Sequence, residues 1–385
     1  MGRRKEAVQA ASEAVTVWRR LASTQFGTFA ADLAKSLGSL ANRLNDVGQH
    51  QQALQVAEEG VEIWRPLTTQ NPNVYNQELA KALYNLANRL GELGQQKNSL
   101  EASKEAVSLF RNLSKQNPDL FMYKLAMSLS NYALRLSVLG NYEDAVAIAE
   151  EAVTIFRPLS VMKPDAHNSD LANSLNTLSN RLGDLNRHEE SFLAAVEAVA
   201  LWRKPVAKNP EAFRNDLGIA VGNLSIRLSN LGRYPEAIIS ANECVNIFRA
   251  LAFESSDGFN PELAASLSNI SKIFFEIDKY DDGINAIKES ILIYRNLSLS
   301  RPKIFDINLG LSLNIIFDYY QKSGLNLESL SVAREAVSIF RSMLDTENKI
   351  SSDNLKKSLN NLARVLSELN NHEEAMIISN EANEL

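Results

Sequence analysis

An aromatic residue followed by arginine recurs every 46 residues along the whole chain. Seven successive spacings of equal length mean that one structural repeat is copied end to end, without insertions in any loop. A fixed period of about 20 to 50 residues predicts a solenoid, because a single repeat cannot bury its apolar face and must stack on its neighbours. The eight pairs are Trp18-Arg19, Trp64-Arg65, Phe110-Arg111, Phe156-Arg157, Trp202-Arg203, Phe248-Arg249, Tyr294-Arg295 and Phe340-Arg341.

Each repeat is predicted to contain a first helix, a turn and a second helix. The first helix carries apolar residues at the helical spacing, as in Leu37, Leu40, Ala41 and Leu44. The turn contains residues that enter the left-handed backbone region cheaply, and a column of small residues on the second helix indicates close packing of helices. The turn column is Gly2, Gly48, Gly94, Gly140, Asn186, Gly232, Asp278, Gly324 and Asn370. The small-residue column is Ala14, Gly60, Ala106, Ala152, Ala198, Cys244, Ser290, Ala336 and Ala382.

These columns resemble the tetratricopeptide signature, most clearly at Leu40-Ala41, Leu44, Gly48, Ala53 and Gly60. Repeats of that family usually have about 34 residues. The longer repeats of this chain are similar to those of the kinesin-light-chain subtype and of arrays attached to bacterial and fungal signalling proteins. The resemblance implies an all-α, right-handed superhelical solenoid of antiparallel helix pairs. It also implies a protein that binds other proteins and is not an enzyme.

We expect one solenoid domain over residues 1–385. It comprises an unpaired second helix at about 2–22, seven complete pairs at about 28–346 and an eighth, shortened pair at about 350–385, which makes 17 helices. Neither end carries the polar capping repeat with which solenoids normally finish. We therefore expect either a piece of a longer protein or weak self-association through uncapped ends, because an exposed apolar face favours association.

Asparagine is concentrated on the side of the first helices that lies opposite the apolar stripe. It fills eight of sixteen positions in two columns three residues apart, although it is a mediocre helix former. In the superhelices that the sequence resembles, this side lines a concave groove. An exposed amide both donates and accepts, so a ladder of amides can hold the backbone of an extended peptide; alternatively, the amides bond only within or between helices. The ladder is Asn42, Asn85, Asn88, Asn131, Asn180, Asn223, Asn269 and Asn361.

Two columns of charged residues accompany the ladder. Arginine flanks it in five successive repeats, which favours either a basic strip for acidic or phosphate groups or the neutralisation of carboxylates on neighbouring helices. Glutamate fills a column of the second helices, six residues before the arginine of each aromatic-arginine pair. That separation does not place the two charges on one helix face, so we predict ion pairs between helices or repeats. The basic strip is Arg43, Arg89, Arg135, Arg181 and Arg227, and the glutamates are Glu13, Glu59, Glu105, Glu151, Glu197, Glu243, Glu289, Glu335 and Glu381.

Composition and motifs argue against several other functions. The net charge of −6 gives no electrostatic footprint for nucleic acid, and no apolar stretch is long enough to span a membrane. A single cysteine, Cys244, and the lack of a secretory signal favour the cytoplasm. His50, His188 and His372 share one turn column and are too far apart to bind one zinc ion. No catalytic or cofactor motif is present, so we expect no catalytic residue, metal or cofactor.

The expected function is a non-enzymatic scaffold that binds an extended peptide or a helix in its concave groove. One alternative is a sensor or regulatory segment of a larger signalling or defence protein, and another is a structural solenoid that assembles with itself. A clamp for a C-terminal carboxylate is disfavoured, because the position before the ladder holds residues such as Gly38, Tyr84 and Ser130 where lysine is needed.

Overall fold

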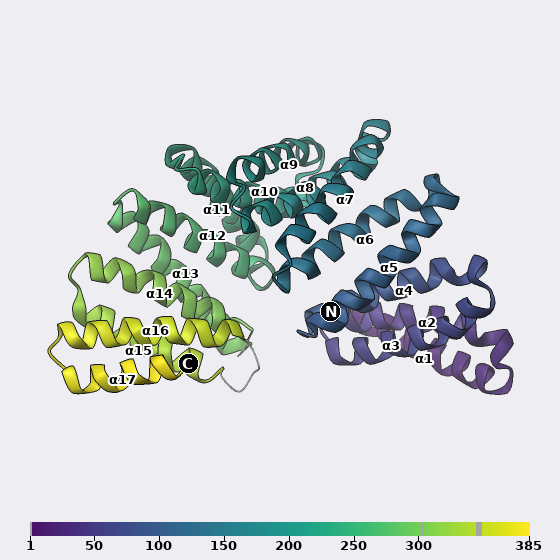
Figure 1. Ribbon diagram of the computed structural model, residues 1–385, viewed down its shortest axis with the longest axis horizontal. Coiled ribbons are helices and arrows are strands. Elements are labelled where there is room, and N and C mark those ends of the chain that lie inside the picture. Colours follow the sequence, from purple (N-terminus) through teal and green to yellow (C-terminus); the bar gives the residue numbers. More distant parts are fainter. Residues whose placement is uncertain (1, 302–303, 344–348) are drawn as a thin grey trace. The chain divides into compact units, whose positions relative to one another are not determined.

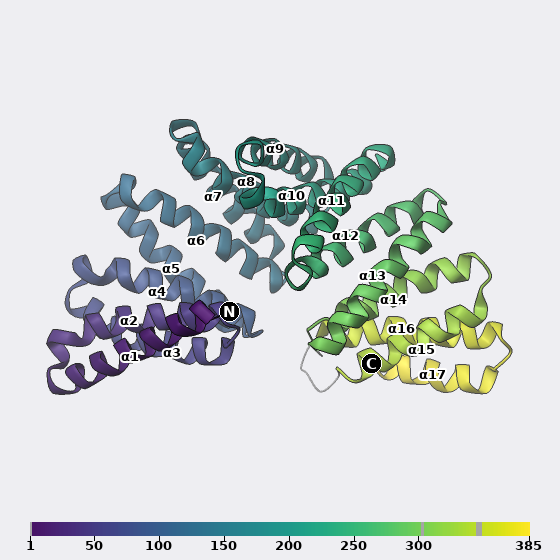
Figure 2. The same ribbon diagram turned by 180° about the vertical axis from the view of Figure 1, so that it is seen from behind.

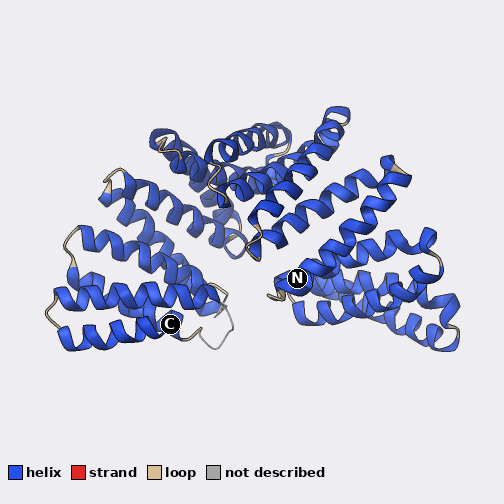
Figure 3. Ribbon diagram, viewed as in Figure 1, coloured by secondary structure: helices blue, strands red, loops and turns tan. Residues whose placement is uncertain are grey.

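The computed structural model describes residues 2–301, 304–343 and 349–385 (Figure 1). Over these residues it contains seventeen α-helices and no strand (Figure 3). The predicted all-α solenoid of helix pairs and the predicted number of helices are confirmed. The helices are α1 (Gly2–Thr24), α2 (Phe26–Asp46), α3 (His50–Gln70), α4 (Pro72–Glu92), α5 (Gln96–Gln116), α6 (Pro118–Val138), α7 (Tyr142–Met162), α8 (Pro164–Asp184), α9 (His188–Lys208), α10 (Pro210–Asn230), α11 (Tyr234–Glu254), α12 (Ser256–Glu276), α13 (Tyr280–Ser300), α14 (Asp306–Lys322), α15 (Asn326–Arg341), α16 (Lys349–Glu368) and α17 (His372–Glu384).

The chain forms two compact units, unit 1 (Met1–Leu201) and unit 2 (Trp202–Leu385). In each unit, every helix packs mainly on the next one along the chain, from α1 to α8 and from α10 to α17. First helices of successive repeats also touch, as α6 touches α8 and α14 touches α16. Viewed from behind, each unit shows the same succession of helices (Figure 2). The single domain over 1–385 stays a prediction, and its expected boundary near residue 346 lies outside the described residues.

The predicted turns are confirmed from the second repeat onwards. Every turn-column residue from Gly48 to Asn370 has a positive φ, between 57° at Asn186 and 81° at Gly140. After Gly48, the Gln49 N–H donates to the Leu44 carbonyl at 2.9 Å, which satisfies an orphan carbonyl at the end of α2. Gly2 is instead the first residue of α1. Four of the following first helices, α4, α6, α8 and α10, begin with proline, whose fixed φ suits the first helical position.

The two residues of the aromatic-arginine pair have opposite environments. From Trp64 to Phe340 the aromatic side chains are all buried, and Phe156 is 1% exposed. The small-residue column is buried at every position except Ala14, which is exposed. The arginines lie at the surface. Each repeat of 46 residues therefore places one aromatic residue in the core and one arginine at the surface.

Each surface arginine pairs with the glutamate 40 residues later, on the second helix of the next repeat. Arg65 reaches Glu105 at 2.8 Å and Arg157 reaches Glu197 at 2.6 Å. All eight arginines of the aromatic pairs make this contact, so the predicted ion pairs between repeats are confirmed.

These ion pairs are expected to stabilise the fold only slightly. The Arg111 and Glu151 side chains are 43% and 36% exposed, and exposed ion pairs typically contribute about 0.2–1 kcal/mol. We expect Glu151→Gln to lower the free energy of unfolding by about 0.5 kcal/mol, measured by urea denaturation. Glu143→Gln on the same helix is the control, because Glu143 is exposed and makes no ion pair with another described residue. A loss several times larger than expected would contradict a surface role.

Candidate functional site

The asparagine ladder lies on the first helices at positions that are mostly half-buried. Asn361 is only 8% exposed, so the expectation of an exposed amide is wrong there. In unit 1 the ladder comprises Asn42 on α2, Asn85 and Asn88 on α4, Asn131 on α6 and Asn180 on α8; in unit 2 it comprises Asn223 on α10, Asn269 on α12 and Asn361 on α16.

Part of the ladder and part of the basic strip form one hydrogen-bond network in unit 1. Arg89 Nη2 donates to Asn42 Oδ1 at 3.1 Å, and Arg135 Nη2 donates to Asn88 Oδ1 at 3.3 Å. Asn131 Nδ2 also donates to Asn88 Oδ1. Each of these bonds joins the first helices of two successive repeats. For these residues, the structure therefore contains the hydrogen bonds between helices that were expected as the alternative to peptide binding.

The basic strip is mostly covered and partly neutralised. Arg43 is 55% exposed at its side chain, whereas the side chains of Arg89 and Arg181 are only 12% exposed. All three pair with a carboxylate three residues later on the same helix. Burial lowers the pKa of the Arg135 guanidinium, and Arg227 on α10 is half-buried. An exposed basic strip is therefore absent from this part of the described face.

Three ladder amides have no hydrogen-bond partner within the described ranges, namely those of Asn85, Asn223 and Asn269. All three occupy the ladder column that precedes the Arg-bonded column by three residues. The ladder therefore divides into amides that join repeats and amides that are available to another molecule.

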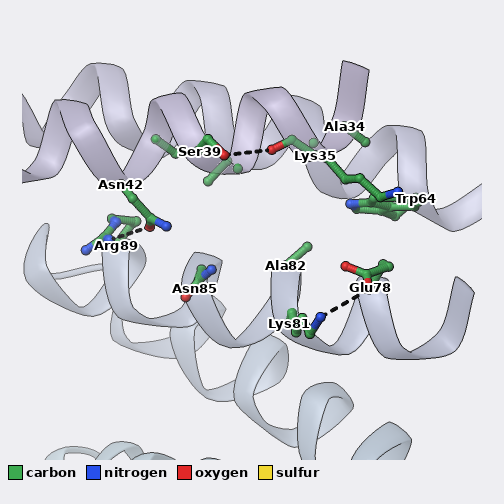
Figure 4. Close-up of a pocket in the computed structure, with 14 residues that line it drawn as sticks. Ala34, Lys35, Ser39, Asn42, Trp64, Glu78, Lys81, Ala82, Asn85 and Arg89 are labelled. Carbon is green, nitrogen blue, oxygen red and sulfur yellow. Dashed lines mark hydrogen bonds and ion pairs between the residues drawn. The ribbon is translucent and has the colours of Figure 1, made fainter. Parts of the chain in front are cut away.

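A hollow of about 290 Å³ opens between the first helices α2 and α4 in unit 1 and is here called the α2–α4 hollow (Figure 4). The hydrogen bond between Arg89 and Asn42 closes one end, while Lys81 and Glu78 form an ion pair of 3.1 Å near the other end. Asn85 lies between these two contacts. The floor comes from α3 and small residues of α2 and includes Ala41, Ala57, Gly60 and Trp64.

A second hollow of about 240 Å³, the α4–α6 hollow, adjoins the first and shares Lys81 and Asn85 with it. Lys124 of α6 lines it, and its ammonium lies 5.2 Å from the centre of the Phe121 ring. Burial lowers the pKa of Lys124, and repulsion from Lys81 acts in the same direction. The unpaired amide of Asn85 is thus accessible from two neighbouring hollows.

Sequence reasoning missed Lys35, Lys81 and the glycines that open the first hollow. Lys35 and Lys81 occupy equivalent positions in successive repeats, four residues before the ladder position at Ser39 and Asn85. That spacing places them on the same face as the ladder, one turn away. The two lysines could therefore have been predicted from their shared column. Gly38 and Gly60 could not, because they belong to different helices and line the same hollow only in the folded chain.

The structure gives no catalytic arrangement around the one cysteine. Cys244 is 5% exposed, and burial raises its pKa to about 12, so its thiol stays protonated near neutral pH. Among the described residues, no group of three or more His, Cys, Asp or Glu side chains is placed to hold a metal ion. In the same ranges, no helix has both the length and the apolar character to span a bilayer.

A family model of the tetratricopeptide repeat matches residues 33–65, 125–157, 171–204 and 357–378. The chain contains tetratricopeptide repeats. The first match runs from the apolar stripe of α2 through the turn at Gly48 to the aromatic-arginine pair of α3. The first three matches begin at equivalent positions of the 46-residue repeat. No curated protein matches the chain in sequence.

Solved structures of other repeat proteins share this fold at low identity. BtubC (BKLC) from P. vanneervenii is 19% identical with a TM-score of 0.51, covering 64% of this chain and 92% of that one. The quorum sensor NprR from B. thuringiensis is 12% identical with a TM-score of 0.57, covering 99% and 97%. PH0952 from Pyrococcus horikoshii, a signal transduction ATPase with a tetratricopeptide repeat sensor, is 13% identical with a TM-score of 0.53, covering 96% and 52%. At these identities the likeness shows the tetratricopeptide fold alone.

Proposed function

We propose that the first-helix face of unit 1 binds an extended peptide segment of a partner protein, and that the chain is a non-enzymatic interaction scaffold. Asn85 carries the proposal. Its amide is half-buried, has no hydrogen-bond partner within the described ranges and lines both hollows. An amide in this setting offers one donor group and one acceptor to the N–H and C=O groups of a peptide backbone.

The other ladder residues are assigned different roles in this proposal. Asn42, Asn88 and Asn131 hold adjacent first helices together through their hydrogen bonds, so they support the face. Asn223 and Asn269 are the equivalents of Asn85 in unit 2, and their unpaired amides favour the same role there. Residues that support the face should affect stability, whereas Asn85 should affect binding.

Replacement of Asn85 by alanine tests this division. The probe is a fluorescein-labelled peptide, obtained by selection from a random linear peptide library displayed on phage with the full chain as target. We expect Asn85→Ala to weaken binding about tenfold, the loss of roughly two hydrogen bonds, as measured by fluorescence anisotropy. The melting temperature should stay unchanged, because the amide has no partner within the described part of the protein.

Asn112→Ala is the matched control, because Asn112 is an exposed asparagine on the second helix α5 of the same unit. It should leave both affinity and melting temperature unchanged. Failure to select any peptide, or an Asn85→Ala protein that melts earlier and binds equally well, would overturn the proposal.

A second candidate function is a sensor or regulatory segment of a larger signalling protein. Two of the similar structures are described as a quorum sensor and as a signalling ATPase with a repeat sensor. The likeness to the ATPase covers nearly all of this chain and 52% of the ATPase, an architecture in which a repeat array is one part of a longer protein. Peptide binding is compatible with both candidates. Co-purification of the chain with a signalling domain whose activity changes on peptide addition would favour the second.

A further inference from the structure

We infer that the α2–α4 hollow is a pocket for one bulky, uncharged apolar side chain of the bound peptide. The inference rests on the proposed function and adds the chemistry that the site selects. It is carried by three observations: the depth of this hollow compared with the next one, the glycines that give it this depth, and the state of the charged groups around its mouth.

The α2–α4 hollow reaches the second helix more deeply than the α4–α6 hollow does. Its lining includes Ala57, Gly60 and Trp64 of α3. The lining of the α4–α6 hollow includes only Phe110 of α5, which is the equivalent of Trp64. The difference follows from the residue at the position of Gly38, because Tyr84 stands there in the next repeat and lines that hollow.

Two glycines, Gly38 and Gly60, line the α2–α4 hollow. In no other repeat are both equivalent positions glycine; Tyr84 with Ala106, and Ser130 with Ala152, stand at the next two. The fold does not require Gly38, since a Cβ added there would have no neighbour within 4 Å. Glycine inside a helix is unfavourable relative to nearly every other residue. An unfavourable residue that relieves no close contact therefore has one visible structural effect, which is open space at Gly38 in the wall of the hollow.

The chemistry of the lining favours an apolar occupant. The floor consists of alanine, glycine and the indole of Trp64, which is 3% exposed overall. The polar groups stand at the rim, where Lys81 pairs with Glu78 and Arg89 donates to Asn42, while Lys35 also lines the hollow and makes no ion pair with another described residue. A charged side chain that reached the floor would lose water among alanine, glycine and indole groups, which is costly. An apolar side chain loses nothing there.

The size of the hollow favours a single side chain. Pockets for drug-sized ligands measure about 300–1,000 Å³, and the volume of about 290 Å³ here lies at the small end of that range, which suits one large side chain. Asn85 at the rim can meanwhile bond to the backbone of the same peptide residue or its neighbour. Aromatic and aliphatic anchors that fill such pockets dominate the affinity of many interfaces, while the surrounding contacts contribute little.

Gly38→Tyr tests the pocket with the residue that the chain itself uses in the next repeat. The tyrosine should cover the floor and weaken binding of the selected peptide about tenfold or more, with a melting temperature equal to or above that of the wild type. Gly38→Leu provides a smaller plug in case the tyrosine perturbs folding. Gly27→Tyr is the matched control, because Gly27 is on the same helix, is exposed and also has no neighbour within 4 Å of an added Cβ.

A double-mutant cycle with the peptide makes the test specific. The bulky apolar residue shared by selected peptides, when replaced by alanine, should weaken binding to the wild type but not to Gly38→Tyr, because the two changes remove one contact. If Gly38→Tyr and Gly38→Leu bind like Gly27→Tyr, or if selected peptides share no apolar residue, the pocket inference fails. Loss of binding in Asn85→Ala would in that case leave the proposed function standing; absence of any selected peptide would overturn both.

Discussion

Replacement of Gly283 by serine is expected to lower the free energy of unfolding by about 3 kcal/mol, the upper part of the range for overpacked cores. A Cβ at this position would lie 1.8 Å from the Tyr319 hydroxyl oxygen and 2.2 Å from its Cζ. Tyr319 cannot move aside easily, because it is fully buried and its hydroxyl donates to the Ser271 carbonyl. Urea denaturation followed by circular dichroism measures the loss.

The next repeat supplies the compensating change for this clash. Ser329 and Val365 occupy the positions equivalent to Gly283 and Tyr319, so a serine fits where the facing residue is smaller. The double variant Gly283→Ser, Tyr319→Val should therefore lose much less stability than the sum of the two single losses. Equal urea midpoints for Gly283→Ser and the wild type would show that Tyr319 has another low-energy position.

Phe156→Ala is expected to cost about 4 kcal/mol, whereas Arg157→Ala should cost only about 0.5 kcal/mol. Phe156 is 1% exposed, and its ring lies 5.9 Å from that of Tyr123 in an edge-on arrangement, so truncation leaves a cavity in a close-packed core. The Arg157 side chain is 52% exposed and makes an ion pair with Glu197 that water can replace.

The comparison is informative because both residues recur with the same regularity in the sequence. If the free energy of unfolding of both variants is measured under the same denaturing conditions, any difference between them reflects burial, because both residues are repeated equally often. Similar losses for the two would mean that the surface pairs contribute far more than exposed ion pairs usually do, and the modest loss expected for Glu151→Gln would then be wrong as well.

The turns and the ion pairs could be predicted because each depends on residue type and period alone. A left-handed residue stands in each described turn from a first helix to its second helix, and Asn186 and Asp278 adopt this conformation as glycine does elsewhere. The glutamates could not pair on their own helix, which left the neighbouring repeat as the partner. Both inferences are local or strictly periodic, so no knowledge of packing distances was needed.

The hydrogen bonds and burial of the ladder could not be predicted in the same way, because they depend on how neighbouring repeats pack. The spacing of residues in the sequence does not give that packing. Arg89 meets Asn42 and Arg135 meets Asn88 across 47 residues, one more than the repeat length, because the arginine column directly follows the asparagine column in the sequence. Comparing the two columns across repeats would have found this pairing; comparing them within one helix could not. The α2–α4 hollow was still harder to predict from the sequence, since its lining combines Gly38 with a second glycine 22 positions away on another helix.

The ion pairs between repeats have a consequence for how such a chain can change in length. Each repeat supplies one arginine to the repeat after it and one glutamate to the repeat before it. If recombination removed residues 97–142, one whole period, Arg65 would meet Glu151 in place of Glu105, and no charge would lose its partner. A deletion whose length is not a whole number of periods would shift the two columns apart. The ion pair between one repeat and the next is therefore the same at every interface. This allows the array to gain or lose copies in single genetic events.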